Sequence, residues 1–338
     1  MKGAVLGVGR MGRRHVEMMQ KLGMDIVGVS DPRQESLDLA ASENGIPTDR
    51  QYSSPARLLD EGRPEFVVVA STADAHCELT CLAAEMGARY VLCEKPMACS
   101  IDECRSMIAA CRSTGARLAI NHPMRFMAYY TAPKAIVNSC EFGGLTSMTV
   151  VGGNFGVAMN GTHFVEAFRY LTEEDPEEVT AWFDSDKVPN PRGEQFEDAS
   201  GSIRVTTKSG CKLYLECGAR QGHGINVILA GPYGQIAIDQ LTGTMSVTFR
   251  NEEHRNLPST RYGMPFVESQ TRLDPPNMVD LCTSMAVSLI EGMSYATGED
   301  GMMALSTLVA AYVSNESGHT AVSIRSSELP GSRRFPWA

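Results

Sequence analysis

Short apolar runs alternate with amphipathic segments over the first 122 residues. The runs are rich in Val, Ile, Leu and Ala, and they lie at residues 3–8, 25–30, 66–70, 90–93 and 117–120. Continuous apolar runs of this length are typical of strands that are buried on both faces of a parallel sheet. The segments between them carry helix signals, such as Ser100 three residues before Glu103 and the later Gly115. The alternation predicts a doubly wound α/β domain over residues 1–122.

The pattern changes after residue 122. Longer runs in which apolar and polar residues alternate are separated by turn residues, and they lie at 145–155, 201–207, 212–217, 225–230, 235–239 and 244–250. This alternation predicts an antiparallel sheet with one helix near 161–171 and two more helices at the end of the chain. The polar, aperiodic stretch 251–276 predicts a long loop. We therefore expect a second α/β domain over residues 123–338.

A glycine-rich turn directly follows the first apolar run. It comprises Gly7, Gly9, Arg10, Met11 and Gly12. Between a strand and a helix, this spacing allows a tight turn, a close approach to a pyrophosphate and close packing of helix on strand.

The second strand ends at Asp31, 19 residues after Gly12, where a carboxylate binds the ribose hydroxyls of a dinucleotide. A carboxylate repels a 2′-phosphate, so Asp31 favours NAD over NADP. Arg33, two residues later, weakens that preference, although it can equally be a solvated residue. The alternative for the whole motif is a glycine turn next to a solvated aspartate.

Glu94, Lys95 and Pro96 follow the strand at 90–93. Ligands of open α/β sheets bind beyond the carboxyl ends of the strands, so Lys95 is expected where a cofactor and a substrate meet. Its ammonium can hydrogen-bond a reacting oxygen and transfer the proton, especially if burial lowers its pKa. The alternative is a surface ion pair with Glu94. Pro96 is compatible with a cis turn.

Composition and charge exclude several classes of protein. The net charge is −10 and no run of Lys or Arg occurs, so a duplex nucleic acid is not an expected partner. No apolar run reaches membrane-spanning length, and the first residues resemble a buried strand more than a signal peptide. The ten cysteines form no C-x-x-C pair, so no metal is expected. A soluble, cytoplasmic protein is the expectation.

Taken together, these motifs resemble the Gfo/Idh/MocA family, the relatives of glucose–fructose oxidoreductase and inositol dehydrogenase. The resemblance rests on the glycine turn, on Asp31 and on five further segments, which are 71–76, 94–96, 121–126, 161–163 and 298–300. It implies an NAD-binding Rossmann domain, a C-terminal domain with a large, mostly antiparallel sheet, and homodimers or homotetramers joined through the open face of that sheet. It implies a hydride transfer at a hydroxyl-bearing carbon of a sugar, an amino sugar or a sugar derivative.

The resemblance also assigns roles to individual residues. Lys95 and His163 would act on the substrate hydroxyl, and five residues would line the cofactor, which are Ser71, Thr72, His76, Glu94 and Arg125. The substrate would meet Lys95 and His163 together with Asn121, Arg125 and Asn160. A neutral imidazole at His163 can accept the alcohol proton. A helical histidine alone is more often a structural residue.

The chain departs from the family pattern next to His163. Many members carry Asp four residues earlier, where this chain has Met159. On an α-helix Met159, Asn160, His163 and Glu166 would share one face, so Asn160 could orient the imidazole without supplying a negative charge. Proton transfer would then depend more on Lys95.

Two other functions remain open. One is a glycoside-cleaving enzyme that oxidises C3 of a sugar transiently with bound NAD, and the other is a dinucleotide-binding regulator without turnover. Net formation of NADH with a free sugar favours the dehydrogenase, whereas cleavage without it favours the glycosidase. The presence of both Lys95 and His163 speaks against the regulator.

Overall fold

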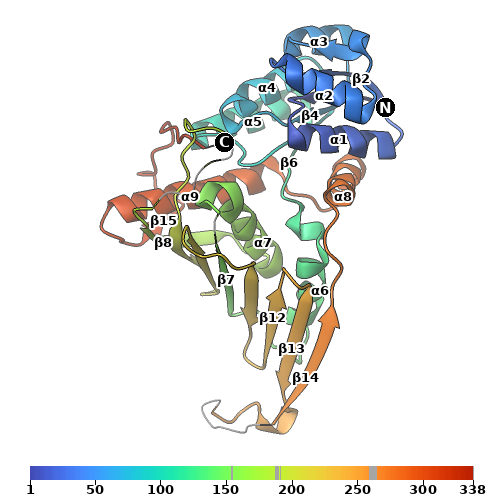
Figure 1. Ribbon diagram of the computed structural model, residues 1–338. Helices are drawn as coiled ribbons and strands as arrows, with labels where there is room; N and C mark the ends of the chain where they lie inside the picture. The colour runs from blue at the N-terminus through green and yellow to red at the C-terminus, as the bar shows by residue number, and fades with distance from the viewer. Residues whose placement is uncertain (154, 187–189, 191, 259–264, 338) are drawn as a thin grey trace.

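The computed structural model describes residues 1–153, 155–186, 190, 192–258 and 265–337. Two sheets organise it, one in each half of the chain (Figure 1). The predicted α/β architecture, a doubly wound parallel sheet followed by a mostly antiparallel one, is confirmed. Within the described residues, no helix has both the length and the apolar character needed to cross a bilayer.

The first sheet has six parallel strands in the order β3-β2-β1-β4-β5-β6, the arrangement typical of a dinucleotide-binding fold. Its strands are β1 (Lys2–Leu6), β2 (Asp25–Ser30), β3 (Gln51–Tyr52), β4 (Phe66–Val69), β5 (Tyr90–Cys93) and β6 (Arg117–Ile120). The connecting helices are α1 (Arg10–Lys21), α2 (Gln34–Asn44), α3 (Pro55–Gly62), α4 (Ala73–Glu85) and α5 (Ile101–Thr114). All five predicted strands are confirmed. The short edge strand β3 was not predicted, because two residues form no pattern.

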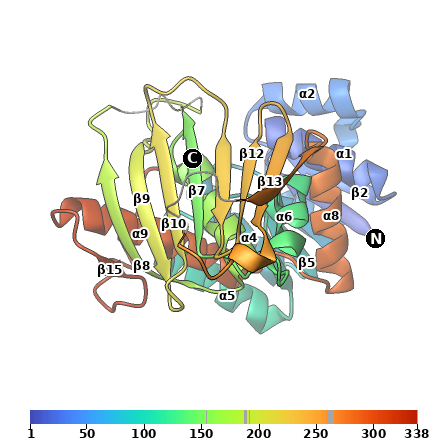
Figure 2. The same cartoon turned by 90° about the horizontal axis from the view of Figure 1, so that it is seen from below.

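The second sheet has nine strands in the order β14-β13-β12-β11-β7-β10-β9-β8-β15. They are β7 (Ser147–Gly153), β8 (Pro176–Phe183), β9 (Gly201–Thr207), β10 (Lys212–Gly218), β11 (Asn226–Ala230), β12 (Gly234–Asp239), β13 (Thr244–Arg250), β14 (Phe266–Arg272) and β15 (Val322–Ser323). The pairing of β7 with β10 is parallel, and the other pairings are antiparallel. Figure 2 shows these strands side by side from below.

Four helices follow the first domain in the described part of the chain, namely α6 (Ala128–Val137), α7 (Thr162–Thr172), α8 (Met278–Glu291) and α9 (Gly298–Glu316). A π-helical turn at Val157–Gly161 leads into α7, and short 3₁₀ turns lie at Thr48–Arg50, Pro123–Phe126 and Glu252–His254. Helix α6 was not predicted, because Pro133 interrupts its sequence pattern.

The prediction of one long loop over residues 251–276 is wrong at β14. All seven residues of that strand are exposed, so its side chains follow no burial pattern that a sequence could reveal. Backbone pairing with β13 forms the strand instead. Residues 259–264 of the predicted loop lie outside the described residues.

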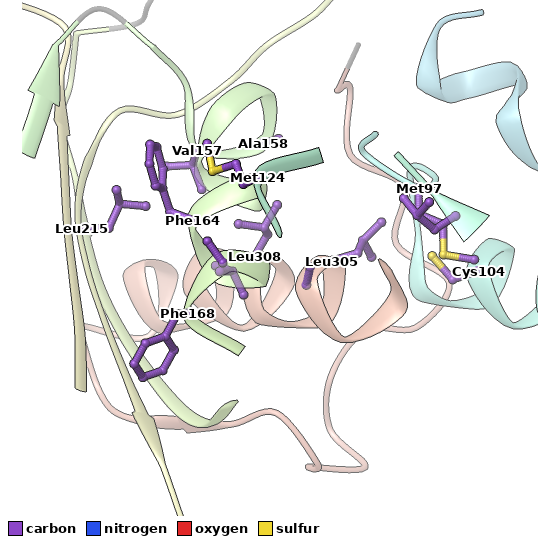
Figure 3. Close-up of a cluster of buried hydrophobic side chains, with 14 of the residues drawn as sticks. Met97, Cys104, Met124, Val157, Ala158, Phe164, Phe168, Leu215, Leu305 and Leu308 are labelled. Atoms are coloured by element: carbon purple, nitrogen blue, oxygen red, sulfur yellow. The ribbon is translucent and has the colours of Figure 1, made fainter. Parts of the chain in front are cut away.

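Helix α7 lies between the second sheet and α9. Its fully buried Phe164 and Phe168 extend from the helix toward the sheet, where Leu215 of β10 lies, and Leu308 of α9 lies behind them (Figure 3). Burying side chains of this size contributes about 1.5–3 kcal/mol each. This packing fixes the start of α7, which carries His163.

Two segments join the halves of the molecule. Helix α8 packs against α1 and contributes Cys282, Met285 and Leu289 to the core beneath the first sheet. At the other side, the C-terminal tail lies against the first domain, as Figure 1 shows, and the backbone N–H of Phe335 donates to Cys99 O at 2.9 Å. These two contacts fix the position of the second domain relative to the carboxyl edge of the first sheet.

Candidate active site

The glycine turn after β1 leaves the backbone open on one side. Gly7 has a φ of +91°, and a Cβ there would lie 2.7 Å from the backbone nitrogen of Ser71. A Cβ on Gly12 would lie 1.9 Å from Gly7 O, so only glycine lets α1 pack this close to the turn. A Cβ on Gly9 would have only the Arg33 guanidinium nearby, at 3.8 Å. Backbone N–H groups at the start of α1, where Arg10 and Met11 lie, are therefore accessible to a phosphate.

Asp31 follows β2 and faces this turn. Its carboxylate is buried and accepts hydrogen bonds from Val8 N at 3.1 Å and from Arg33 N at 3.0 Å. The Arg33 side chain, 70% exposed, reaches the same carboxylate at 3.3 Å. Ser71 and Thr72 follow β4 at the neighbouring strand end, where Thr72 precedes α4. Turn, helix N-terminus and carboxylate fit the pyrophosphate and ribose of a dinucleotide.

Glu94 lies in a buried network beneath Lys95. Its Oε1 accepts hydrogen bonds from His15 Nε2 and from Asn121 Nδ2, both at 2.7 Å, and its Oε2 accepts one from Lys95 N at 3.3 Å. Although burial raises the pKa of Glu94, His15 and Lys95 lower it to about 2. Burial lowers the pKa of His15, but Cys282 and Glu94 outweigh it and raise this pKa to about 10, so the imidazole carries a charge that Glu94 balances. Glu94 and Asn121 thus support the loop that carries Lys95.

The Lys95 ammonium extends from the end of β5 to the second domain. Nζ donates to Met159 O at 2.5 Å, in the π-helical turn that precedes α7. Burial lowers the pKa of Lys95 to about 8, and Arg192 and Arg10 act in the same direction, against Glu94 and Asp198. The Lys95–Pro96 peptide bond is cis. A half-buried amine with this pKa is suited to proton transfer near neutral pH.

His163 lies beside Lys95 and a second histidine. The rings of His163 and His122 meet edge to face, with centroids 5.3 Å apart. Burial lowers the pKa of His163 far below its usual range, and the Lys95 charge adds to the effect. The same two causes lower the pKa of His122 to about 3. Both imidazoles are therefore neutral, and His163 Nδ1 is buried without a hydrogen-bond partner.

Two of the predicted site residues have protein partners instead of facing an open space. His76 Nδ1 lies 2.9 Å from Pro96 O and its Nε2 3.2 Å from Ser71 O, so this ring links two loops at the sheet edge. Arg125 forms a buried ion pair with Glu166 and also contacts Ser294.

Asn160, by contrast, lies in the π-helical turn. The α-helical spacing assumed for residues 159–163 therefore applies only from Thr162 onward. The functional roles of these residues stay predictions.

Three residues that surround Lys95 were not predicted from the sequence. Asp198 accepts from the backbone of Met159, Arg192 contributes a positive charge, and His15 pairs with Glu94. His15 is three residues after Gly12 on the buried side of α1, which is a local signal for a structural role. Asp198 and Arg192 lie about a hundred residues from Lys95 in the chain, and no spacing rule connects them to it.

Comparison with known proteins agrees with this geometry. The family model described as "Oxidoreductase family, NAD-binding Rossmann fold" matches residues 1–122, and that described as "Oxidoreductase family, C-terminal alpha/beta domain" matches residues 152–324. The chain is 28% identical to 1,5-anhydro-D-fructose reductase from Ensifer adhaerens, over 88% of this chain and 91% of that protein. It is 26% identical to inositol 2-dehydrogenase 2 from Saccharopolyspora erythraea, over 94% of each.

Among solved structures, the fold is similar to that of an oxidoreductase from Agrobacterium radiobacter in complex with NAD⁺, L-tartaric acid and magnesium. The TM-score is 0.80 at 19% identity, over 96% of this chain and 98% of the other. Both domains match the same family in the order that the motifs indicated. The chain belongs to the Gfo/Idh/MocA family of NAD-binding oxidoreductases.

Proposed function

We propose that this protein is an NAD-dependent dehydrogenase or reductase that acts on a hydroxyl-bearing carbon of a sugar, an amino sugar or a sugar derivative. The observation that carries the proposal is the position of the Lys95 ammonium. It lies at the carboxyl end of β5, at the same sheet edge as the glycine turn that follows β1, and it bonds to Met159 of the second domain near His163. Groups that bind a dinucleotide and groups that move a proton therefore share one edge.

The cofactor would be held by the glycine turn, the start of α1 and Asp31, with Ser71 and Thr72 beside it. The nicotinamide of a bound NAD supplies a hydride acceptor for alcohol oxidation, or a hydride donor in its reduced form for ketone reduction. Asp31 favours NAD because its buried carboxylate would face, and repel, the 2′-phosphate of NADP. The Arg33 guanidinium next to it already contacts that carboxylate.

Lys95 and His163 would handle the proton of the substrate hydroxyl. A hydroxyl that donates to one of them and accepts from the other satisfies groups that are otherwise costly to bury. His163 Nδ1, which has no partner, supports this assignment. In alcohol oxidation a neutral amine or imidazole accepts the proton, and in ketone reduction the ammonium donates it.

The relatives support a cyclic, polyhydroxylated substrate. Their names include 1,5-anhydro-D-fructose reductase, inositol 2-dehydrogenase and aldose–aldose oxidoreductase. Each of these names refers to a sugar or a ring polyol. Multiple hydroxyl groups suit a site whose polar residues are bases and amides, as Lys95, His163 and Asn160 are.

We also propose a homodimer or a homotetramer through the open face of the second sheet. Tyr214 of β10 and Ile228 of β11 are exposed on this face, and both pair in register with Thr149 of β7 between them. Light scattering of the purified protein would test the assembly. A monomer at micromolar concentration would contradict it.

The test of the activity is a screen of sugars, amino sugars, ring polyols and nucleotide sugars for a change in NADH absorbance. NAD and NADP are compared in parallel, and the Lys95→Met variant is the control for the site. We expect at least one substrate to give NADH with NAD, and no signal from the variant. Turnover of the same substrate by the variant, or glycoside cleavage without net NADH, would contradict the proposal.

A further inference from the structure

The carboxylate of Asp198 is bound to the turn that accepts the Lys95 hydrogen bond. One oxygen accepts from Ala158 N and the other from Met159 N, both at 2.7 Å, and the side chain is buried. These are N–H groups at the start of a helical segment, which have no partner within the helix. Bonds from such groups to a carboxylate are charge-assisted and are among the stronger hydrogen bonds in proteins.

The same peptide unit faces Lys95 on its other side. Met159 N donates to Asp198, and Met159 O accepts from Lys95 Nζ at 2.5 Å. The residue is therefore fixed at both polar atoms, and the position of its carbonyl oxygen determines where the ammonium can lie. The Met159 side chain takes no part in either bond.

Gly156 makes room for this arrangement. A Cβ at position 156 would lie 2.0 Å from Asp198 Oδ2 and 2.6 Å from Asp198 Cβ, so any other residue would force the carboxylate away. The backbone at Gly156 has a φ of −88°, which every residue tolerates. Contact with Asp198, rather than backbone strain, requires the glycine.

From this geometry we propose that Asp198 is a positioning residue, which fixes the Met159 peptide as the hydrogen-bond acceptor that aims the Lys95 ammonium into the active site. The inference rests on the proposed function of Lys95. Asp198 itself does not touch the substrate in this account, and it acts through the backbone of Met159.

The charge of Asp198 also affects Lys95. Several charged and titratable groups surround the ammonium. They are Glu94 after β5, Arg10 on α1, His122 after β6, His163 on α7, and Arg192 and Asp198 before β9. Asp198 favours the charged amine, because it is negative and because it holds the acceptor Met159 O in place. Its loss would therefore lower the pKa of Lys95 on both counts.

The experiment compares Asp198→Asn with Asp184→Asn, which removes an exposed carboxylate from the rim of the same cavity of about 350 Å³ that Asp198 lines. Trace labelling with acetic anhydride at a series of pH values, followed by mass spectrometry of the Lys95 peptide, reports the pKa of this amine. It needs neither cofactor nor substrate. Lys95 is one of seven lysines, so its peptide is readily distinguished.

We expect the midpoint of Lys95 labelling to fall by about half a pH unit or more in Asp198→Asn and to stay at the wild-type value in Asp184→Asn. With a substrate from the screen, kcat should fall about tenfold in Asp198→Asn, with an unchanged KM for NAD. An unchanged labelling midpoint in folded Asp198→Asn would overturn the proposal, whatever the screen finds. Failure of the screen with a shifted midpoint would instead remove only the proposed function.

A second variant covers the case in which Asp198→Asn does not fold. Gly156→Ala keeps the carboxylate but displaces it from Met159 N. It should shift the Lys95 midpoint in the same direction. A folded Gly156→Ala protein with wild-type labelling would equally overturn the positioning role.

Discussion

The rate of alcohol oxidation should depend on the protonation of Lys95. Burial lowers the pKa of this amine from 10.5 to about 8. At pH 7 roughly a tenth of the molecules then carry a neutral amine, against ~0.03% for a lysine with its ordinary pKa, a gain of about 300-fold in the basic form. Below pH 8 kcat/KM for oxidation should therefore rise about tenfold per pH unit and then level off. Ketone reduction, which needs the ammonium, should show the opposite dependence.

Two variants separate the proton-transfer role of Lys95 from its packing role. Lys95→Arg keeps a positive charge that does not dissociate in this range, and Lys95→Met keeps a similar length without charge. Both should lower turnover by about a hundredfold or more and remove the inflection near pH 8, while NAD binding persists.

The assay is initial NADH formation between pH 6 and 9.5 with saturating NAD, with NAD affinity measured separately by fluorescence. A flat wild-type profile, or an inflection near pH 8 that persists in Lys95→Met, would refute the reasoning.

Three further expectations follow from the site. Asp31→Ala should weaken NAD binding by about 10- to 100-fold, since charge-assisted hydrogen bonds contribute ~1.5–3 kcal/mol. It should also narrow the preference for NAD over NADP. Fluorescence titration with both cofactors measures these affinities, and an NAD affinity equal to that of the wild type would contradict the prediction. Glu94→Gln should lower the free energy of unfolding in urea by about 3–5 kcal/mol, because it leaves the buried charge of His15 unpaired. Because the pKa of Glu94 is lowered in the folded protein, the ionised carboxylate stabilises the wild type above pH 4.5, and this stabilisation is lost as the pH falls toward 2. The Glu94→Gln variant should lack this loss of stability in acid. A loss equal to that of the wild type would contradict the pairing. His163→Asn should lower turnover about a hundredfold with unchanged NAD affinity, and a normal rate would make this residue structural.

The first domain was predictable because its signals are local. Strands buried on both faces leave continuous apolar runs, and the glycine turn has a fixed spacing to Asp31. By contrast, β14 is exposed along its whole length and leaves no pattern. Strand β8, which also was not predicted, contains adjacent glutamates at 177 and 178, which interrupt its alternation.

The site residues that could be predicted from the sequence belong to short motifs. The contacts between residues of different segments could not be predicted. Lys95 and His163 are recognisable from their neighbours in the chain. The pairing of His15 with Glu94 joins residues 79 positions apart, and the bonds of Asp198 to the turn before α7 span about 40. Such pairs depend on how distant segments of one domain fold against each other, which no periodicity within one segment records. The π-helical turn at Val157–Gly161 likewise shifted Asn160 from the face that α-helical spacing assigned to it.

A crystal structure of the NAD complex would show where the dinucleotide binds. We expect the pyrophosphate to lie on the turn at residues 7–12 and the nicotinamide ring to lie within a few ångströms of Lys95 Nζ. A dinucleotide bound elsewhere, or a nicotinamide directed away from this amine toward bulk solvent, would contradict the account.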